Sequence, residues 1–215
     1  MLSDGYLVNG SEPWIIPNPD DLGDFDAEFV KENLTDDQYL PYKRNKETLA
    51  RGWAIPGTKG LEHRIGGIEK QDVTGNVNYD SDNHEKMVQL RAKKVANIAN
   101  ELPPTEVFGK KKGDLLILSW GSTHGACRSA TESLLAENLK VAHVSIRWIS
   151  PLPNDLKDIL SNYKKVLMPE INTGQFRQMI RAEFLVDAIG LNEVQGKPLG
   201  TSTIVVKAKE IINER

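Results

Sequence analysis

The chain contains very little cysteine and no long apolar run. Cys127 is the only cysteine among 215 residues. A single thiol excludes an intrachain disulfide, a Cys-rich zinc site and an iron-sulfur cluster held by this chain alone. No apolar run approaches the roughly 20 residues that cross a bilayer, and the start of the chain lacks the basic and apolar regions of a signal peptide. We therefore expect a cytoplasmic protein without a membrane segment.

The chain also lacks an excess of charge of either sign. With 27 basic and 30 acidic residues its net charge is only −3, so its field should not attract nucleic acid or anionic lipid strongly. The length allows one full domain and part of another, because a single core organises about 100 to 200 residues. Such a chain is long enough to fold without disulfides or metals.

Regular periodicity is scarce in residues 1 to about 80, which hold more than half of the glycine and aspartate and nearly half of the proline. This part predicts loops and extended segments. A stretch of that length without regular structure is uncommon inside a compact domain and suggests a binding arm or a truncated domain. Truncation is the expectation, because Tyr6, Leu7 and Val8 resemble the end of a buried strand whose preceding elements are missing.

The rest of the chain begins with a helix and a buried strand. Capping residues at 81–83 precede apolar residues spaced three or four apart, which predicts a helix that the prolines at 103–104 end. The continuous apolar run 114–120 lies between two glycines, as is typical of a strand buried on both faces. We expect this strand to lie in the centre of a parallel sheet.

A second strand follows after a crossover helix. A helix over 123–138 and a strand over 141–149 complete one βαβ unit with the first strand. The second strand alternates apolar residues with His143, Ser145 and Arg147, which predicts one apolar and one polar face. We therefore expect it to be half covered, near an edge or an interface.

The alternation of strands and helices then repeats. The patterns predict a helix around 154–161, a strand over 165–168 and a helix over 175–186. The last segment, 202–214, fits a helix, although its first residues also suit a strand. The predicted fold is α/β, with a mostly parallel open sheet, helices on both faces and a loop-rich N-terminal arm.

Two loops follow predicted parallel strands and open helices, where an open sheet binds ligands. The first contains Gly121, Ser122 and Thr123, and the second contains Glu170 and Asn172. A small anion or nucleotide is one interpretation, but the first loop has neither G-x-G-x-x-G nor the lysine of a P-loop. Glycine turns and an asparagine N-cap explain the same residues without a ligand.

A third loop, 60–67, places Glu62, His63 and Arg64 consecutively between glycines, a mixture able to bind a carboxylate, shuttle a proton or form an interface. An ordinary solvated loop explains it equally well. Cys127 lies one turn into a helix, where the dipole could lower its pKa, but it has no base partner in sequence and is expected to be buried and inert. We expect no catalytic or metal-binding residue in this chain.

Seven short motifs occur along the chain. They are Leu2-Ser3-Asp4-Gly5-Tyr6-Leu7, Ser11-Glu12-Pro13-Trp14, Gly60-Leu61-Glu62-His63, Asn83-His84-Glu85-Lys86-Met87, Trp120-Gly121-Ser122-Thr123, Val166-Leu167-Met168-Pro169-Glu170 and Val194-Gln195-Gly196-Lys197-Pro198. In their order and spacing they resemble the 2-oxoacid:acceptor oxidoreductase family, and in it the alpha subunit of 2-oxoglutarate:ferredoxin oxidoreductase. The similarity spans essentially the whole chain.

The resemblance implies an oligomeric thiamin-diphosphate enzyme that decarboxylates a 2-oxoacid, reduces ferredoxin and acylates coenzyme A, with a beta subunit as partner. It implies that 1–40 are a remnant of the pyrimidine-binding thiamin domain, 41–82 a linker, and 83–215 a domain like the C-terminal domain of transketolase. The catalytic glutamate and the motif for pyrophosphate and Mg2+ do not occur here, and the iron-sulfur cluster belongs to the full complex. The resemblance therefore assigns no catalytic residue to this chain.

Two alternatives stay open beside this enzyme component. One is an autonomous small-anion or nucleotide-binding module with Gly121, Ser122, Thr123 and Glu170 as its loop residues. The other keeps the enzyme and changes the substrate to pyruvate or another 2-oxoacid. Under the main hypothesis the chain serves subunit assembly and is inactive alone. The candidate interface residues are Glu62, His63, Arg64, His143 and Arg147.

Overall fold

A computed structural model describes residues 10–11, 15–23, 29–30 and 39–214. The chain divides into two compact units, one covering residues 14–101 and one whose main part begins at Leu102. The segment Tyr6–Val8, expected to end a buried strand, lies outside the described residues. No helix in the described part is both long enough and apolar enough to cross a membrane.

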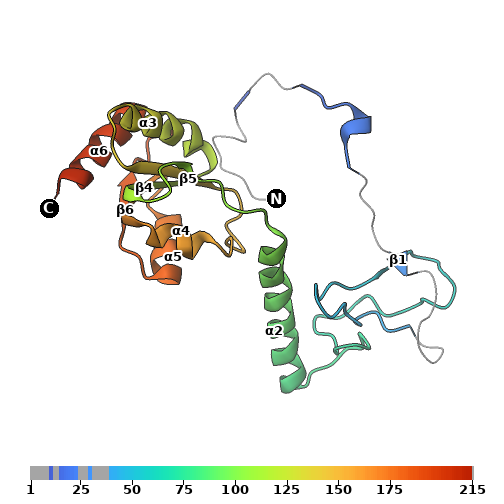
Figure 1. Ribbon diagram of the computed structural model, residues 1–215. Coiled ribbons are helices and arrows are strands. Elements are labelled where there is room, and N and C mark those ends of the chain that lie inside the picture. Colours follow the sequence, from blue (N-terminus) through green and yellow to red (C-terminus); the bar gives the residue numbers. More distant parts are fainter. Residues whose placement is uncertain (1–9, 12–14, 24–28, 31–38, 215) are drawn as a thin grey trace. The chain divides into compact units, whose positions relative to one another are not determined.

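The unit that begins at Leu102 contains a five-stranded sheet in the order β3-β5-β4-β6-β7 (Figure 1). All neighbouring strands are parallel except β3, which pairs antiparallel with β5. The predicted central strand is confirmed, because β4 lies between β5 and β6. The strands are β3 (Phe108–Gly109), β4 (Gly113–Trp120), β5 (Val141–Ile146), β6 (Tyr163–Glu170) and β7 (Ala188–Asn192).

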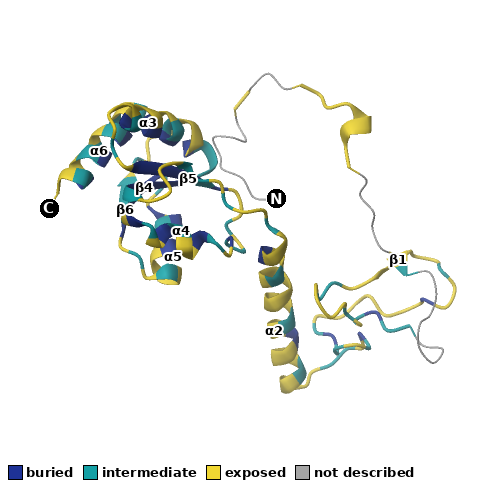
Figure 2. Ribbon diagram, in the orientation of Figure 1, coloured by how far each residue is buried: buried dark blue, intermediate teal, exposed yellow. Residues whose placement is uncertain are grey.

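Helices cover both faces of this sheet, as the apolar run of β4 predicts. Leu115 and Ile117 face a core shared with α3 and α6, whereas Leu116 and Leu118 face a core shared with α4 and α5. All four leucine and isoleucine side chains are fully buried, as the dark colour of the strand shows (Figure 2). The helices are α3 (His124–Ala136), α4 (Leu156–Ser161), α5 (Gln175–Phe184) and α6 (Thr201–Asn213).

The last segment of the chain forms helix α6, so the choice between helix and strand is decided in favour of the helix.

Two strands of the five-stranded sheet, β7 and β3, were not predicted. The segment 188–192 contains Gly190 and ends in Asn192, so its composition is that of a loop, yet it pairs along its whole length with β6. The short β3 pairs at only two positions, Phe108 with His143 and Gly109 with Ala142. Tertiary pairing determines both strands, not local composition.

The expectation of a solvated polar face on β5 is wrong at His143. Its alternating pattern does place apolar and polar residues on opposite faces, but His143 is only 2% exposed. The reason is that β3 pairs alongside it and α3 covers its face, with the tilted ring of His124 at 5.4 Å between centroids. Only from Ser145 onward does this side of the strand become more accessible.

The unit of residues 14–101 is loop-rich in its described part, as predicted. Before its one long helix, the regular elements of the described part are a 3-10 turn, η1 (Pro19–Asp21), and two paired two-residue strands, β1 (Phe29–Val30) and β2 (Trp53–Ala54). The ion pairs of Asp72 with Arg44 (3.2 Å) and Lys86 (2.8 Å) connect three segments of this unit. Polar contacts thus link segments of this unit that are far apart in the sequence.

The long helix of this unit is α2 (Ser81–Asn97), followed by a 3-10 turn, η2 (Ile98–Glu101). Its N-cap is Asp80, whose side chain accepts from the Asn83 backbone, one residue before the predicted capping residues. The predicted apolar face remains accessible within this unit, because Val88 and Val95 are 45% and 44% exposed. The buried residue of α2 is instead Met87.

Candidate functional site

The carboxyl ends of β4 and β6 meet at the point where the chain reverses its direction across the sheet. From β4 the chain runs to β5 on one side, and from β6 it runs to β7 on the other. Parallel sheets usually bind ligands in the crevice at such a point. Here the crevice is crossed by a hydrogen bond, because Trp120 Nε1 donates to Glu170 Oε1 at 3.2 Å.

Glu170 holds the second predicted loop in place. Its carboxylate is 1% exposed and accepts from the backbone N-H groups of Phe176 (3.2 Å) and Arg177 (3.1 Å), in the first turn of α5. The Asn172 side chain also donates to it, while Asn172 Oδ1 accepts from the Gly174 backbone at 2.7 Å. These bonds satisfy the helix N-terminus, so the carboxylate has a structural role.

The first predicted loop forms a short 3-10 turn, η3 (Gly121–Thr123). Gly121 has a φ of 59°, which favours glycine, and it lines a pocket. Thr123 is buried and its hydroxyl donates to the Trp120 carbonyl at 2.9 Å, so it closes the turn. Ser122 does not line the pocket. The two loops therefore lie side by side as expected, but Gly121 is the one of these positions that borders open space.

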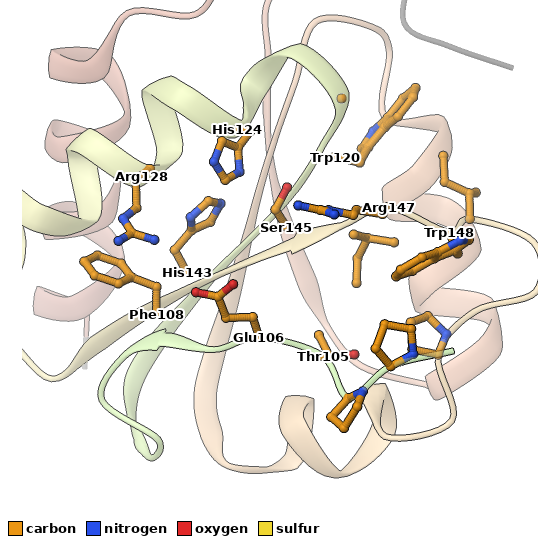
Figure 3. Close-up of a pocket in the computed structure, with 16 residues that line it drawn as sticks. Thr105, Glu106, Phe108, Trp120, His124, Arg128, His143, Ser145, Arg147 and Trp148 are labelled. Carbon is orange, nitrogen blue, oxygen red and sulfur yellow. The ribbon is translucent and has the colours of Figure 1, made fainter. Parts of the chain in front are cut away.

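The pocket lies beside the predicted crevice, towards the β3 edge of the sheet. Its volume is about 530 Å3, within the usual range for sites of small ligands. Because β3 pairs with only two residues of β5, the edge beyond His143 is left uncovered, and α3 forms the opposite wall. Figure 3 shows side chains from both walls and from the strand pointing into this space. The polar residues that line it are Thr105, Glu106, His124, Arg128, His143, Ser145 and Arg147.

A chain of polar groups leads from the core to this pocket. Ser119 Oγ lies 2.7 Å from His143 Nε2, and the ring of His143 contacts that of His124 in a tilted arrangement. Burial, followed by the nearby His124 and Arg128, lowers the pKa of His143 to about 3. The imidazole is therefore neutral at pH 7. Since Ser119 is fully buried, this serine-histidine pair cannot present a nucleophile to a substrate.

Cys127 behaves as expected from the sequence. Its side chain is fully buried, and burial raises the pKa of the thiol to about 12, against the opposing effect of hydrogen bonds with Ser119 and Thr123. The dipole of α3 does not produce a reactive thiolate. Nor does this cysteine suit an iron-sulfur cluster, and no group of three or more His, Cys, Asp and Glu side chains in the described ranges is arranged to hold a metal ion. The described part of the chain does not fit a metal centre of its own.

The loop 60–67 belongs to the unit of residues 14–101. Glu62, His63 and Arg64 are exposed, and the first two make local hydrogen bonds. Glu62 Oε2 accepts from the Gly60 backbone at 2.9 Å, and His63 Nδ1 lies 2.8 Å from the Leu61 carbonyl. The backbone carbonyl of Arg64 accepts from the buried Lys70 at 3.0 Å. These hydrogen bonds fix the backbone of the loop, and the side chains of Glu62, His63 and Arg64 are exposed to solvent.

The residues that sequence reasoning missed are Glu106, His124, Arg128 and Trp148. The topology of the βαβ unit could have indicated those on the crossover helix. In such a unit the end of the second strand lies near the start of that helix, so the polar face of the 141–149 strand and the helix start at 123–124 were predictable neighbours. Glu106 and Trp148 lie in irregular segments, so their convergence depends on tertiary structure alone.

Comparison with known proteins gives one consistent family. The chain is 42% identical over 197 residues, 91% of its length, to 2-oxoglutarate oxidoreductase subunit KorA of Mycobacterium tuberculosis, of which it covers 29%. It is 32% identical over 113 residues, 51% of its length, to 2-oxoacid:ferredoxin oxidoreductase subunit alpha of Saccharolobus solfataricus, of which it covers 18%. No model of a protein family matches the chain.

Solved structures agree. A 2-oxoglutarate:ferredoxin oxidoreductase from Magnetococcus marinus, solved with 2-oxoglutarate, coenzyme A and succinyl-CoA bound, matches 92% of this chain with a TM-score of 0.83 and 31% identity. The chain covers 34% of that structure's chain. The chain thus spans about a third of these relatives and is similar to them in both sequence and fold. The resemblance predicted from the motifs is confirmed, because the similarity is to a part of the alpha subunit of 2-oxoglutarate:ferredoxin oxidoreductase.

Proposed function

We propose that this chain is part of a thiamin-diphosphate-dependent 2-oxoacid:ferredoxin oxidoreductase and serves there as a subunit-assembly domain without catalytic residues of its own. The reaction of the whole enzyme converts 2-oxoglutarate, coenzyme A and two oxidised ferredoxins into succinyl-CoA, CO2, two reduced ferredoxins and a proton. The two electrons come from the carbon-carbon bond that breaks on decarboxylation. The acyl group passes to the thiol of coenzyme A.

The 42% identity over 197 residues to an alpha subunit carries this proposal. Because the chain spans only about a third of its relatives, the groups that activate the cofactor are expected elsewhere in the complex. Thiamin diphosphate, Mg2+ and the iron-sulfur cluster are therefore assigned to the complex. Cytoplasmic location, and partnership with a beta subunit, ferredoxin and coenzyme A, belong to the same proposal.

Exposed apolar side chains beside charged residues support a role in assembly. In the loop 60–67 and just beyond it, Ile65 is 82% exposed and Ile68 is fully exposed. They accompany the exposed Glu62, His63 and Arg64. Interfaces commonly combine an apolar centre with a charged rim. We propose this surface as a subunit interface; Arg147 is exposed and stays a candidate, whereas the buried His143 is unsuited to direct contact.

The domain assignment stays part of the proposal. Residues 1–40 would be the remnant of a pyrimidine-binding thiamin domain, 41–82 a linker and 83–215 a domain of the transketolase C-terminal type. Deletion variants test it. A protein of residues 83–215 should unfold cooperatively with the α/β unit intact. Loss of its cooperative transition would contradict the proposed boundary, since the sheet and its four helices lie within residues 102–214.

Reconstitution tests the function. The purified chain alone should show no reduction of a viologen dye with 2-oxoglutarate, whereas it should bind to the beta subunit in the presence of the rest of the alpha subunit. Dye reduction by the isolated chain would contradict the proposal. Failure of the intact chain to associate would exclude the assembly role.

Two matched variants locate the interface. Ile65→Glu with Ile68→Glu places charges in the proposed apolar centre and should weaken association at least about tenfold, because desolvating a charge is costly. Leu185→Glu places a charge at a residue that is 90% exposed in the α/β unit and should leave association unchanged. Equal behaviour of the two variants would remove the loop from the interface.

The alternative of an autonomous module that binds a small anion or nucleotide at Gly121, Ser122, Thr123 and Glu170 has less support. Thr123 and Glu170 are buried and form hydrogen bonds within the fold, so they do not present free groups to a ligand.

The substrate of the complex can be tested directly. Comparing dye reduction with 2-oxoglutarate, pyruvate and a branched 2-oxoacid in the reconstituted assembly decides it. Preference for 2-oxoglutarate is expected.

A further inference from the structure

The pocket between α3 and the edge of β5 has a basic end, a polar middle and an aromatic end. It reaches from His124 and Arg128 to the flat surface of Trp148 and the prolines beside it (Figure 3). All of its lining residues belong to the α/β unit. The chemistry of these three parts determines the class of ligand.

The basic end contains one arginine whose position is fixed by its neighbours. The guanidinium of Arg128 lies 3.2 Å from the centre of the Phe108 ring and its Nε donates to Glu132 at 3.0 Å. The ring of His124 lies against that of His143 in a tilted arrangement. Arg147 enters the pocket from the end of β5 (Figure 3). An anionic group placed here meets two guanidinium groups and an imidazole, and Arg128 has little conformational freedom left to lose.

The electrostatics of this end agree with the geometry. Burial lowers the pKa of His143, and the nearby His124 and Arg128 lower it further, so this imidazole is neutral at pH 7. The guanidinium groups of Arg128 and Arg147 supply the positive charge of this end. The N-terminus of α3, a helix of 13 residues that begins at His124, adds its partial positive charge.

The middle of the pocket carries groups suited to hydroxyls. Thr105 is anchored by Asp155, which accepts from its backbone N-H at 2.7 Å and from its hydroxyl at 2.6 Å. Beside it Glu106 points its carboxylate into the pocket, and Ser145 adds a hydroxyl (Figure 3). A carboxylate beside a basic end is unfavourable for a plain dianion, but it accepts hydrogen bonds from sugar hydroxyls.

The other end is apolar and flat. Trp148 is 38% exposed, and Ile149 and three prolines, Pro103, Pro104 and Pro153, complete this wall. Aromatic faces bind flat rings by stacking, and such a contact does not depend on the exact ring. An inorganic anion would leave this wall unused, and a purely apolar molecule would leave the basic end unpaired.

We propose that this pocket binds a nucleoside phosphate, with its phosphate between His124, Arg128 and Arg147, its sugar beside Glu106 and its base against Trp148. The pocket is large enough for one such molecule. The site does not require the oxidoreductase assignment, since every group comes from the α/β unit. The same chemistry occurs in a free nucleotide and in the nucleotide part of coenzyme A, so both sources are tested.

Titration of the full chain with ADP, followed by tryptophan fluorescence and calorimetry, tests the site. ADP should bind with one site, while adenosine, which lacks the phosphate, and inorganic phosphate, which lacks the ring, should each bind at least about tenfold more weakly. Coenzyme A binding more tightly than ADP would identify the carrier of the nucleotide. No binding of either at about 1 mM, or phosphate binding as tightly as ADP, overturns the proposal.

Variants with matched controls connect binding to the pocket. Arg147→Ala and Trp148→Ala should each weaken ADP binding at least about tenfold, and both residues are exposed, so the fold should persist. Lys197→Ala, an exposed lysine outside the pocket, and Trp53→Phe, an exposed tryptophan in the other unit, should bind ADP as the wild type does. Unchanged binding in both pocket variants, with urea midpoints equal to the wild type, would overturn the assignment.

Discussion

Glu170 is the residue at which a functional and a structural interpretation of the sequence can be separated by one measurement. Its carboxylate accepts four hydrogen bonds: Oε1 accepts from Trp120, Asn172 and the Phe176 backbone, and Oε2 accepts from the Arg177 backbone. A ligand-binding carboxylate would keep free lone pairs for its ligand. A carboxylate that fixes two loops and a helix start should instead stabilise the folded state.

The magnitude follows from these bonds. Glu170→Ala leaves four donors without their acceptor, at about 1 to 3 kcal/mol for each donor that stays buried. Water can replace the acceptor for some of them, so we expect a total loss of about 3 to 5 kcal/mol. Glu170→Gln can keep its carbonyl oxygen at the Oε1 position and lose only the bond to Arg177. Its expected cost is about 1 to 2 kcal/mol.

Urea denaturation measures both variants. Replacing Trp14 and Trp53 by phenylalanine leaves Trp120 and Trp148, so that fluorescence reports on the α/β unit. With an m-value of about 1 to 3 kcal/mol per molar urea, the midpoint of Glu170→Ala should fall by roughly 1 to 3 M, and that of Glu170→Gln by less. Glu183→Ala, an exposed carboxylate on the same helix, should change stability by less than about 0.5 kcal/mol. If Glu170→Ala were as stable as Glu183→Ala, the structural role of this carboxylate would be refuted.

Three further outcomes are expected. Cys127, whose thiol pKa is raised to about 12, is about 0.01% thiolate at pH 8 and should react with iodoacetamide only after unfolding in urea; labelling of the native protein within minutes would contradict its burial. His143 has a pKa lowered to about 3 from 6.5, so the unfolded chain binds a proton that the folded one does not, and stability should fall as pH drops from 6.5 towards 3, by up to about 2 kcal/mol at pH 5. Urea midpoints from pH 4 to 7 should show a smaller slope in His143→Gln, and an unchanged slope would show that other groups cause it. Gly113→Ala would place a Cβ 2.2 Å from the Lys140 carbonyl oxygen and should cost about 1 to 3 kcal/mol, whereas Gly125→Ala, with open space around it, should be neutral or stabilising by up to about 1 kcal/mol; equal melting temperatures would contradict this.

The sequence predicted most of the α/β layer because its signals are local and strong. The run of β4 is apolar at consecutive positions, and both faces are buried, one by each core. The strand β7 was missed, because a short segment with Gly190 and a terminal Asn192 has no pattern that distinguishes it from a loop. Its existence depends on pairing with β6, which no local signal contains.

The candidate site was predicted less well, for a related reason. The position of the two loops at one edge of the sheet follows from topology and is correct, as the Trp120–Glu170 bond shows. What fills that edge does not follow from topology. Glu170 and Thr123 are polar residues at positions typical of ligand binding, yet both are buried and bonded within the fold. The open space lies beside them instead, where β3 stops after two residues.

Burial therefore separates polar residues that build this fold from those that can meet another molecule. Ser119, Thr131, His143 and Glu170 are each at most 2% exposed and each bonds to a protein group, so mutation should change stability first. Arg147 and Glu106 are exposed and line the pocket. If the site binds its ligand as inferred, substitutions at these two positions should alter binding while leaving unfolding unchanged, the reverse of the effect at Glu170. This opposite behaviour is the physical distinction between a residue that holds a loop and one that recognises a ligand.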